Sequence, residues 1–261
     1  FVNALPGLTL TYNSMSGIEE QARVFDKALE GFVRWYRPDA ILLACNTLSA
    51  VYPETQFARS AKIPVVSIID VGAKMIAERV KAIPTSSVLI LGTATTISSG
   101  MYEQKLGMLG VPSTGIVTQS CQLLESEIQA DPNSDVVGNL VEVYVGQAME
   151  KIGKLPARTL VVGLCCSHYG YSFDAFDRSF RQLGNLRYEL VNPNKAMVAL
   201  FENDVVRGKA SRTLMSVEVA SRVKFTAQEI SSIARAVGAT SRKTAQALKH
   251  YTYKENLFQV K

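Results

Sequence analysis

The sequence has 261 residues, of which 47% are hydrophobic and 20% are charged, a composition typical of a globular protein with one or two domains. No apolar run approaches the ~20 residues of a membrane-spanning helix, and the first residues lack the pattern of a secretory signal. Four cysteines are too few for a disulfide scaffold in a chain of this length. We therefore expect reduced thiols and a cytoplasmic protein that does not bind membranes.

The net charge of +5 is concentrated near the C-terminus. From Val205 to Lys261 the chain carries 11 Lys and Arg residues against 3 Asp and Glu residues. A basic segment of this kind could bind nucleic acid or another anion. Its cations are scattered, however, and form no run, so a solvated surface is the simpler interpretation and nucleic acid is not the expected partner.

Helix-like and strand-like segments alternate along the chain, which is typical of parallel α/β architecture. Ser16 and Glu19 have the spacing of a capping box and predict the start of a helix. Apolar segments predict strands at 40–45 (AILLAC) and 64–69 (PVVSII), and a helix follows around 73–80.

The same alternation continues in the second part of the chain. Strands are predicted at 88–92, 115–119, 160–165 and 187–192, and helices at 99–109, 136–152 and 173–183. Beyond residue 193 the pattern becomes helical. Thr226 and Glu229 form a second capping-box pattern, and Ser241 is placed to cap a last helix that ends near His250.

Two very apolar strands each end in a cysteine followed by small polar residues, in LLACNT and VGLCCS. This similarity predicts two similar domains, each with a parallel sheet flanked by helices. We expect a pseudo-twofold relation between them and an active site in the cleft between them. The first domain is predicted to comprise residues 1–80 and 196–261, and the second residues 81–195.

Cys45 lies where a buried strand should end and a helix should begin. Ligands bind at this edge of parallel sheets, and a helix N-terminus there attracts anions. The same positive end lowers the pKa of a thiol, so we expect a reactive thiolate at Cys45. Asn46 and Thr47 can donate hydrogen bonds to a substrate. The alternative is that Cys45 is a small buried residue with no chemical role.

Cys166 has the same setting and is followed by Ser167 and His168. An imidazolium at His168 could polarise a substrate or lower the pKa of the thiol, although a structural histidine is an equal alternative. Neighbouring side chains of a strand point to opposite faces, so at most one of Cys165 and Cys166 should face a ligand. The Cys-x-x-Cys spacing of metal sites is absent, and we expect no bound metal.

The segment 91–102 (LGTATTISSGMY) joins a strand to a helix through a run of hydroxyl groups. Thr93, Thr95 and Thr96 could bind a carboxylate through their side chains and backbone amides. The glycine and lysine pattern of a phosphate-binding loop is absent. Ordinary helix capping would explain these residues equally well.

Together these segments resemble the aspartate/glutamate racemase superfamily, and glutamate racemase most of all. LLACNTLSA matches the first cysteine motif, and VVGLCCSHYG matches the second, usually written Gly-Cys-Thr-His-Tyr-Pro, with Gly170 in the place of the proline. In LGTATTISSGMY the residues in register are Thr93, Thr96, Ser99 and Tyr102. The resemblance runs from about Ala4 to about Val206.

The resemblance implies an amino-acid racemase that needs no cofactor and uses two bases. Cys45 and Cys166 would remove and return the proton at Cα from opposite faces, with His168 supporting them. The substrate would be a small amino acid, glutamate or aspartate first, and the protein would be a homodimer. The residues that the resemblance assigns to substrate binding are Asn46, Thr47, Thr93, Thr96 and Ser167.

The sequence departs from the family pattern in several places. The opening strand with its Asp-Ser-Gly-x-Gly-Gly turn is absent; ALPGLTLTY (4–12) resembles the family's second strand, so the first is expected upstream of this sequence. The family's Pro-Tyr-Gly loop is not recognisable. An acidic partner for His168 is expected at Glu125 or Glu127. The segment from about Ser211 has no recognised counterpart.

Two alternatives stay open. One is a related enzyme of the superfamily, such as a hydantoin racemase or a cis-trans isomerase. The other is a non-catalytic binding or regulatory protein that retains the fold, an interpretation that the altered second motif and the basic C-terminal segment favour.

Overall fold

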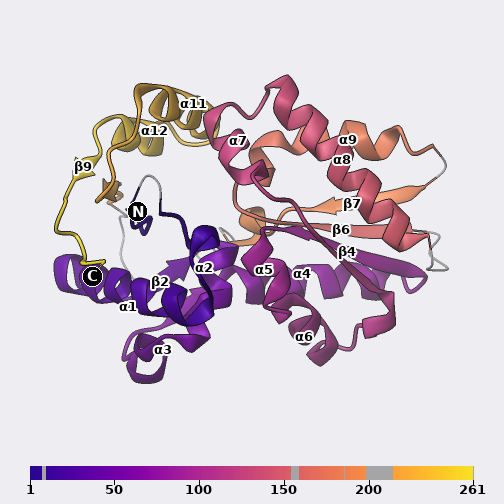
Figure 1. Cartoon of the computed structure of the whole chain (residues 1–261), viewed down its shortest axis with the longest axis horizontal. Coiled ribbons are helices and arrows are strands. Elements are labelled where there is room, and N and C mark those ends of the chain that lie inside the picture. The colour runs from indigo at the N-terminus through magenta and orange to yellow at the C-terminus, as the bar shows by residue number, and fades with distance from the viewer. Residues whose placement is uncertain (8–9, 154–158, 185, 198–213, 261) are drawn as a thin grey trace. The chain divides into compact units, whose positions relative to one another are not determined.

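The computed structural model describes residues 1–7, 10–153, 159–184, 186–197 and 214–260 (Figure 1). The chain divides into two compact units. We call the first the terminal unit, composed of Phe1–Ile41, Val51–Val66 and Gly208–Lys261, and the second the sheet unit, composed of Leu42–Ala50 and Ser67–Arg207. Among the described residues, none of the helices combines the length and apolar character required to span a bilayer.

A four-stranded parallel sheet forms the centre of the sheet unit, with the strand order β5-β4-β6-β7. The two central strands are β4 (Ser86–Gly92) and β6 (Thr159–Cys165), and β5 (Ile116–Ser120) and β7 (Arg187–Val191) flank them. From Val88 to Gly92 and from Leu160 to Cys165, every residue of the central strands is buried. Their continuous apolar runs are typical of strands that are covered on both faces.

Helices cover both faces of this sheet, as Figure 1 shows. On one face, alternate residues of β4 and β6 pack against the helices α7 (Leu124–Ala130), α8 (Asp135–Ile152) and α9 (Phe173–Arg181). On the other face, the intervening residues pack against α4 (Ile68–Ala82) and α6 (Met101–Met108). Because successive side chains of a strand point to opposite faces, the same two strands contribute to two hydrophobic cores, one on each side of the sheet. This arrangement confirms the predicted α/β class.

The terminal unit is built from α1 (Ile18–Tyr36), α3 (Gln56–Ser60) and a small parallel sheet. That sheet joins β1 (Val2–Asn3), β8 (Ala220–Ser221) and β9 (Thr252–Tyr253) in the order β1-β8-β9. Near the C-terminus, Leu257 and Phe258 pack directly on α1 at Gly31, where a Cβ atom would lie 2.3 Å from the Leu257 carbonyl oxygen. Only glycine permits this close approach of two backbones.

Two short strands, β2 (Ile41–Leu43) and β3 (Val65–Ser67), pair with each other. Both are shorter than predicted. Ile68 and Ile69 do not extend the second strand but begin α4, because the Ser67 hydroxyl accepts a hydrogen bond from the Ile69 amide and caps that helix. Most other predicted elements are confirmed to within a few residues.

One local prediction about the N-terminal region is wrong, and another falls partly outside the described residues. Ser16 does not form a capping box with Glu19: its amide and hydroxyl both donate to a carboxylate oxygen of Glu20, and the N-cap is Gly17. The described part of 4–12 contains no strand, and Leu8 and Thr9 lie outside the described residues. The capping box of Thr226 and Glu229 and the cap at Ser241 are confirmed.

The residue boundaries of the two compact units differ from those of the predicted domains. The predicted boundary at residue 80 falls inside α4, whose apolar face packs against the sheet in the sheet unit. Residue 196 immediately precedes 198–213, which lie outside the described residues. Both cysteine segments belong to the sheet unit. The assignment of residues 1–80 with 196–261 and of 81–195 to two domains therefore stays a prediction.

Candidate active site

Cys45 lies between β2 and the helix α2 (Asn46–Val51), as its motif predicts. Its carbonyl oxygen accepts a hydrogen bond from the Ser49 amide at 2.9 Å, so Cys45 occupies the N-terminal end of the helix. The thiol is partly buried, and the amides of Leu48 and Thr47 point at its sulfur. These amides are the groups that stabilise a negative charge at a helix N-terminus.

The pKa of Cys45 is nevertheless raised above its ordinary value, which corrects the expectation of a ready thiolate. Loss of solvent around the sulfur is the largest cause, and the nearby Glu125 carboxylate raises the pKa further. The amides of Leu48 and Thr47 and the Thr47 hydroxyl lower the pKa but do not compensate. In this structure Cys45 is a neutral thiol at pH 7.

Cys166 lies directly after the last residue of β6 and is buried. Burial raises its pKa well above the ordinary value, and the Glu125 carboxylate raises it further, as Cys45 and Cys121 would in their ionised forms. Hydrogen bonding and strand register relate the two cysteine segments, although they are far apart in the sequence: Thr47 bonds to Thr93 at the end of β4, and Gly92 of β4 pairs with Cys165 of β6. The segments that carry the two predicted thiols therefore both lie at the carboxyl end of the β4–β6 pair in the sheet unit.

Cys165 and Cys166 lie on opposite sides of the sheet, as predicted from their adjacency. Cys166 packs in the core beneath α8 and α9, and Cys165 packs in the core beneath α4 and α6. Burial raises the pKa of Cys165 to about 12. Because the two sulfurs point apart, they cannot bind one metal ion together.

His168 makes two contacts through its ring. Its Nδ1 lies 3.8 Å from the Cys166 sulfur, and its Nε2 lies 3.3 Å from Oε1 of Gln129. With an amide oxygen facing Nε2, the neutral ring carries its hydrogen there, and Nδ1 accepts a hydrogen bond from the thiol. The partner in the structure is thus the amide of Gln129; Glu125 and Glu127, the predicted acidic partners, lie on the same helix, α7.

Burial lowers the pKa of His168 to about 4, so the imidazole is neutral at pH 7. Of the two alternatives for His168, an imidazolium beside the thiol and a neutral structural ring, this pKa favours the neutral ring. No cation at His168 offsets the negative charge that a Cys166 thiolate would add. The neutral ring instead provides Nδ1 as a hydrogen-bond acceptor, which orients the thiol hydrogen of Cys166.

A chain of buried hydroxyl groups connects the Cys45 segment to the end of β4. The Thr47 hydroxyl lies 2.8 Å from that of Thr93, which lies 3.0 Å from that of Thr96. Thr93 also caps the short helix α5 (Ala94–Ser98) by accepting from the Thr96 amide. Three residues predicted to bind substrate therefore form one network. Thr95 is buried beside them.

Asn46 is held by a tyrosine that is not among the residues expected to bind substrate. The buried Tyr102 hydroxyl donates to Asn46 Oδ1 at 2.7 Å, and it also contacts the Cys165 thiol. This contact fixes the Asn46 amide with its NH₂ group directed away from the tyrosine. Tyr102 falls in register with the third motif, which is the signal for it in the sequence.

Ser167 lies between the second cysteine and the histidine and is partly exposed. Its carbonyl oxygen accepts a hydrogen bond from Asn194 Nδ2 at 3.1 Å. Another asparagine, Asn192, packs over Gly170, where a Cβ atom would lie 2.4 Å from Asn192 Nδ2. A side chain from the end of β7 thus occupies the space beside Gly170, the residue that stands in the place of the family's proline.

Comparison with known proteins agrees with this arrangement. The family described as Asp/Glu/Hydantoin racemase matches residues 14–164. Glutamate racemase of Streptococcus equi subsp. equi (strain 4047) is 32% identical over 150 residues, which are 58% of this chain and 53% of the relative. Glutamate racemase of Aquifex pyrophilus is 28% identical over 156 residues, 59% of this chain and 56% of the relative. The chain spans about half the length of these relatives.

Solved structures show the same fold. A glutamate racemase isoform from Bacillus anthracis has a TM-score of 0.63 at 19% identity, covering 88% of this chain and 80% of its own. Glutamate racemase from Francisella tularensis in complex with D-glutamate has a TM-score of 0.62 at 19% identity, covering 87% of this chain and 80% of its own. The family match spans more than half of the sequence, and this chain therefore belongs to the Asp/Glu/Hydantoin racemase family.

Proposed function

We propose that the protein is an amino-acid racemase that inverts Cα of glutamate or aspartate by a two-base mechanism at Cys45 and Cys166. The observation that carries the proposal is that the two cysteine segments meet at the carboxyl end of the β4–β6 pair, through the Thr47–Thr93 hydrogen bond and the pairing of Gly92 with Cys165. The names of the two curated relatives, both glutamate racemases, support glutamate as the first substrate to test.

The proposed reaction balances with two thiols and no other reactant. One cysteine, as thiolate, takes the proton from Cα, so that an S–H bond forms while the C–H bond breaks and its electron pair stays on carbon. The other cysteine, as thiol, donates its proton to the opposite face of the same carbon and becomes the thiolate. Racemisation in the reverse direction exchanges the roles.

Formation of the first thiolate needs a positive charge, since burial keeps both thiols neutral. The α-ammonium of an amino-acid substrate supplies one, because an opposite charge within about 4–6 Å favours the ionised form of a thiol. The hydroxyl groups of Thr47 and Thr93 and the NH₂ group of Asn46 are donors for the substrate carboxylate. As the substrate binds, one thiol would release its proton to solvent and become the thiolate base that removes the Cα proton.

The decisive experiment is racemisation of L-glutamate in deuterium oxide, followed by NMR and chiral chromatography. The two-base mechanism predicts that early product carries deuterium at Cα while unreacted substrate does not, because the second thiol has exchanged with solvent. Cys45→Ala and Cys166→Ala should each abolish inversion, whereas Cys165→Ala, on the other side of the sheet, should retain it. Inversion that survives in both site variants would refute the proposal. D-glutamate and both aspartate enantiomers define the substrate range.

A non-catalytic binding protein is the second candidate, and one observation favours it: burial holds both thiols and His168 in their neutral forms. Alkylation with iodoacetamide separates the two candidates. A racemase predicts that glutamate changes the rate of modification at Cys45 and that inversion is lost with the label. If the protein only binds its ligand, glutamate should protect Cys45 from iodoacetamide. The same protein should leave the Cα hydrogen of every tested enantiomer unexchanged.

A further inference from the structure

Four of the C-terminal cations that are scattered in the sequence gather in one groove of the folded terminal unit. The groove has a volume of about 470 Å³ and lies between the helices α11 (Ala227–Gly238) and α12 (Arg242–Lys249). Four cations line it and no carboxylate does; the cations are Arg235, Arg242, Lys243 and Lys249. Within the described residues, none of these four forms a salt bridge.

The charge at the start of α12 is opposite to what helix stability favours. The first turn contains Arg242 and Lys243 and no acidic residue, although the positive end of a helix favours acidic side chains. The backbone amides and the two cations therefore add to a single positive potential. Such an arrangement lowers the stability of the isolated helix and is suited to an anionic partner.

The two helices have the connection of a helix-turn-helix. Only Ala239, Thr240 and Ser241 separate them, and the turn is closed by hydrogen bonds from the Thr240 and Ser241 amides to the Val237 carbonyl oxygen. The two helices are in contact at this turn, since a Cβ atom at Gly238 would lie 3.6 Å from that of Ala245, an ordinary van der Waals distance. The pair forms its own small core with Ala234, Ala245, Leu248 and Val219.

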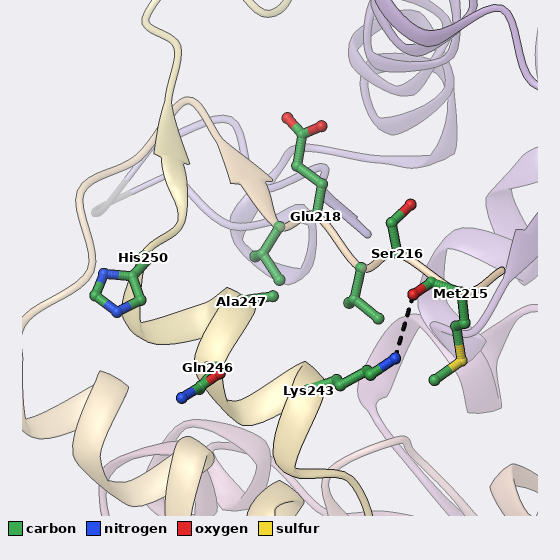
Figure 2. A pocket seen from close by; sticks show the side chains of 9 residues that line it. Met215, Ser216, Glu218, Lys243, Gln246, Ala247 and His250 are labelled. Carbon is green, nitrogen blue, oxygen red and sulfur yellow. Dashed lines mark hydrogen bonds between the residues drawn. The ribbon is translucent and has the colours of Figure 1, made fainter.

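The outward face of α12 is polar along its whole length. Arg242, Gln246 and Lys249 are exposed and are spaced i, i+4 and i+7, which places them on one side of the helix. Figure 2 shows Lys243, Gln246 and His250 from the side of a second groove of about 340 Å³, in which Lys243 Nζ donates to the Met215 carbonyl oxygen at 3.4 Å. The carboxylate in this second groove, Glu218, accepts a hydrogen bond from the Tyr36 hydroxyl.

We propose that α11 and α12 bind duplex DNA, with α12 in the major groove and the four cations on backbone phosphates. The dimensions agree: an α-helix with its side chains is about 10–12 Å in diameter, and the major groove is about 12 Å wide. Gln246, in the middle of the exposed face and not one of the four cations, is of a type that pairs with adenine edges. The binding surface shares no residue with the proposed racemase site.

The test measures fluorescence anisotropy of a short labelled DNA duplex with the full chain over a range of salt concentrations. Phosphate contacts by four cations predict a log–log salt dependence with a slope of about −3.6, and micromolar affinity at moderate salt. Neutralising a contact cation by Arg242→Gln or Lys249→Gln should weaken binding and reduce the slope by about one unit. Lys62→Gln removes an exposed charge elsewhere in the terminal unit and is the matched control.

Three outcomes would overturn the proposal. The first is absence of binding at low salt by a chain whose circular dichroism shows it to be folded. The second is equal weakening by Lys62→Gln and Lys249→Gln, which would indicate a diffuse charge effect. The third is tighter binding of an RNA duplex or of heparin than of DNA, since A-form grooves do not admit a helix and heparin offers charge alone.

Discussion

The Tyr102 hydroxyl donates a hydrogen bond of 2.7 Å to Asn46 Oδ1, and this bond orients the residue next to the first cysteine. Tyr102→Phe removes the donor and leaves a buried acceptor without its partner, a change that costs about 1–3 kcal/mol. We expect kcat/KM for racemisation to fall by about tenfold, which corresponds to about 1.4 kcal/mol of transition-state stabilisation. Tyr144→Phe, which removes a surface hydroxyl bonded to the Gln122 carbonyl, is the control. An unchanged kcat/KM in Tyr102→Phe would contradict the positioning role.

Gly72 in α4 determines how closely that helix approaches Tyr102. A Cβ atom at Gly72 would lie 2.6 Å from the Tyr102 hydroxyl oxygen and 3.0 Å from Pro193 Cγ. Gly72→Ala should therefore reduce the free energy of unfolding by about 1–3 kcal/mol, as measured by denaturant titration. Gly107→Ala, where no atom lies within 4 Å of the added methyl group, should instead be neutral or stabilise by up to about 1 kcal/mol. Equal effects of the two substitutions would show that the contact at Gly72 relaxes without cost.

Thr93 stands at the centre of the hydroxyl chain and caps α5. Thr93→Val keeps the shape of the side chain but deprives Thr47 and Thr96 of their common partner and removes the cap. We expect a loss of about 1–2 kcal/mol of stability and a higher KM for the amino acid. Thr93→Ser restores the hydroxyl group and should recover most of both. If the serine variant behaves like the valine variant, the methyl group and not the network is what matters.

His168 makes stability depend on pH on the acidic side. Its pKa is about 4 in the folded chain and 6.5 ordinarily, so between these values the unfolded chain binds one proton more than the folded chain does. The free energy of unfolding should therefore decrease as the pH falls from about 6.5 to about 4, by at most about 3 kcal/mol from this residue. Urea titrations of the parent chain and of His168→Gln should diverge over this range. Parallel curves would show that His168 is not buried as a neutral ring.

The features that depend on local pattern can be predicted well from the sequence. Strands buried on both faces appear as unbroken apolar runs, so the predicted bounds of β4 and β6 agree with the observed ones to within two residues. The positions of Cys45 and Cys166 at strand ends follow from the same runs. The alternation of side chains along a strand is enough to separate Cys165 from Cys166.

The features that the sequence does not predict depend on tertiary packing and on physical effects that oppose each other. The thiol pKa illustrates this: a helix N-terminus lowers it and burial raises it, and only the folded environment shows that burial is larger at Cys45. The contacts of Tyr102 with Asn46 and of Gln129 with His168 join segments that are far apart in the chain. The gathering of four cations around α12 likewise has no signature in a sequence without a charge run.

The exact position of β6 along its neighbours determines which of the two adjacent sulfurs lies on each side of the sheet. The strand is held in register on both sides, by β4 over its whole length and by β7 over most of it. A slip of one residue would invert the two faces, so that Cys165 would take the orientation of Cys166 and Cys166 would enter the opposite core. Under the proposed mechanism, two adjacent cysteines therefore make racemisation a consequence of strand alignment, and a substitution that loosens β6 is expected to reduce activity before it unfolds the chain.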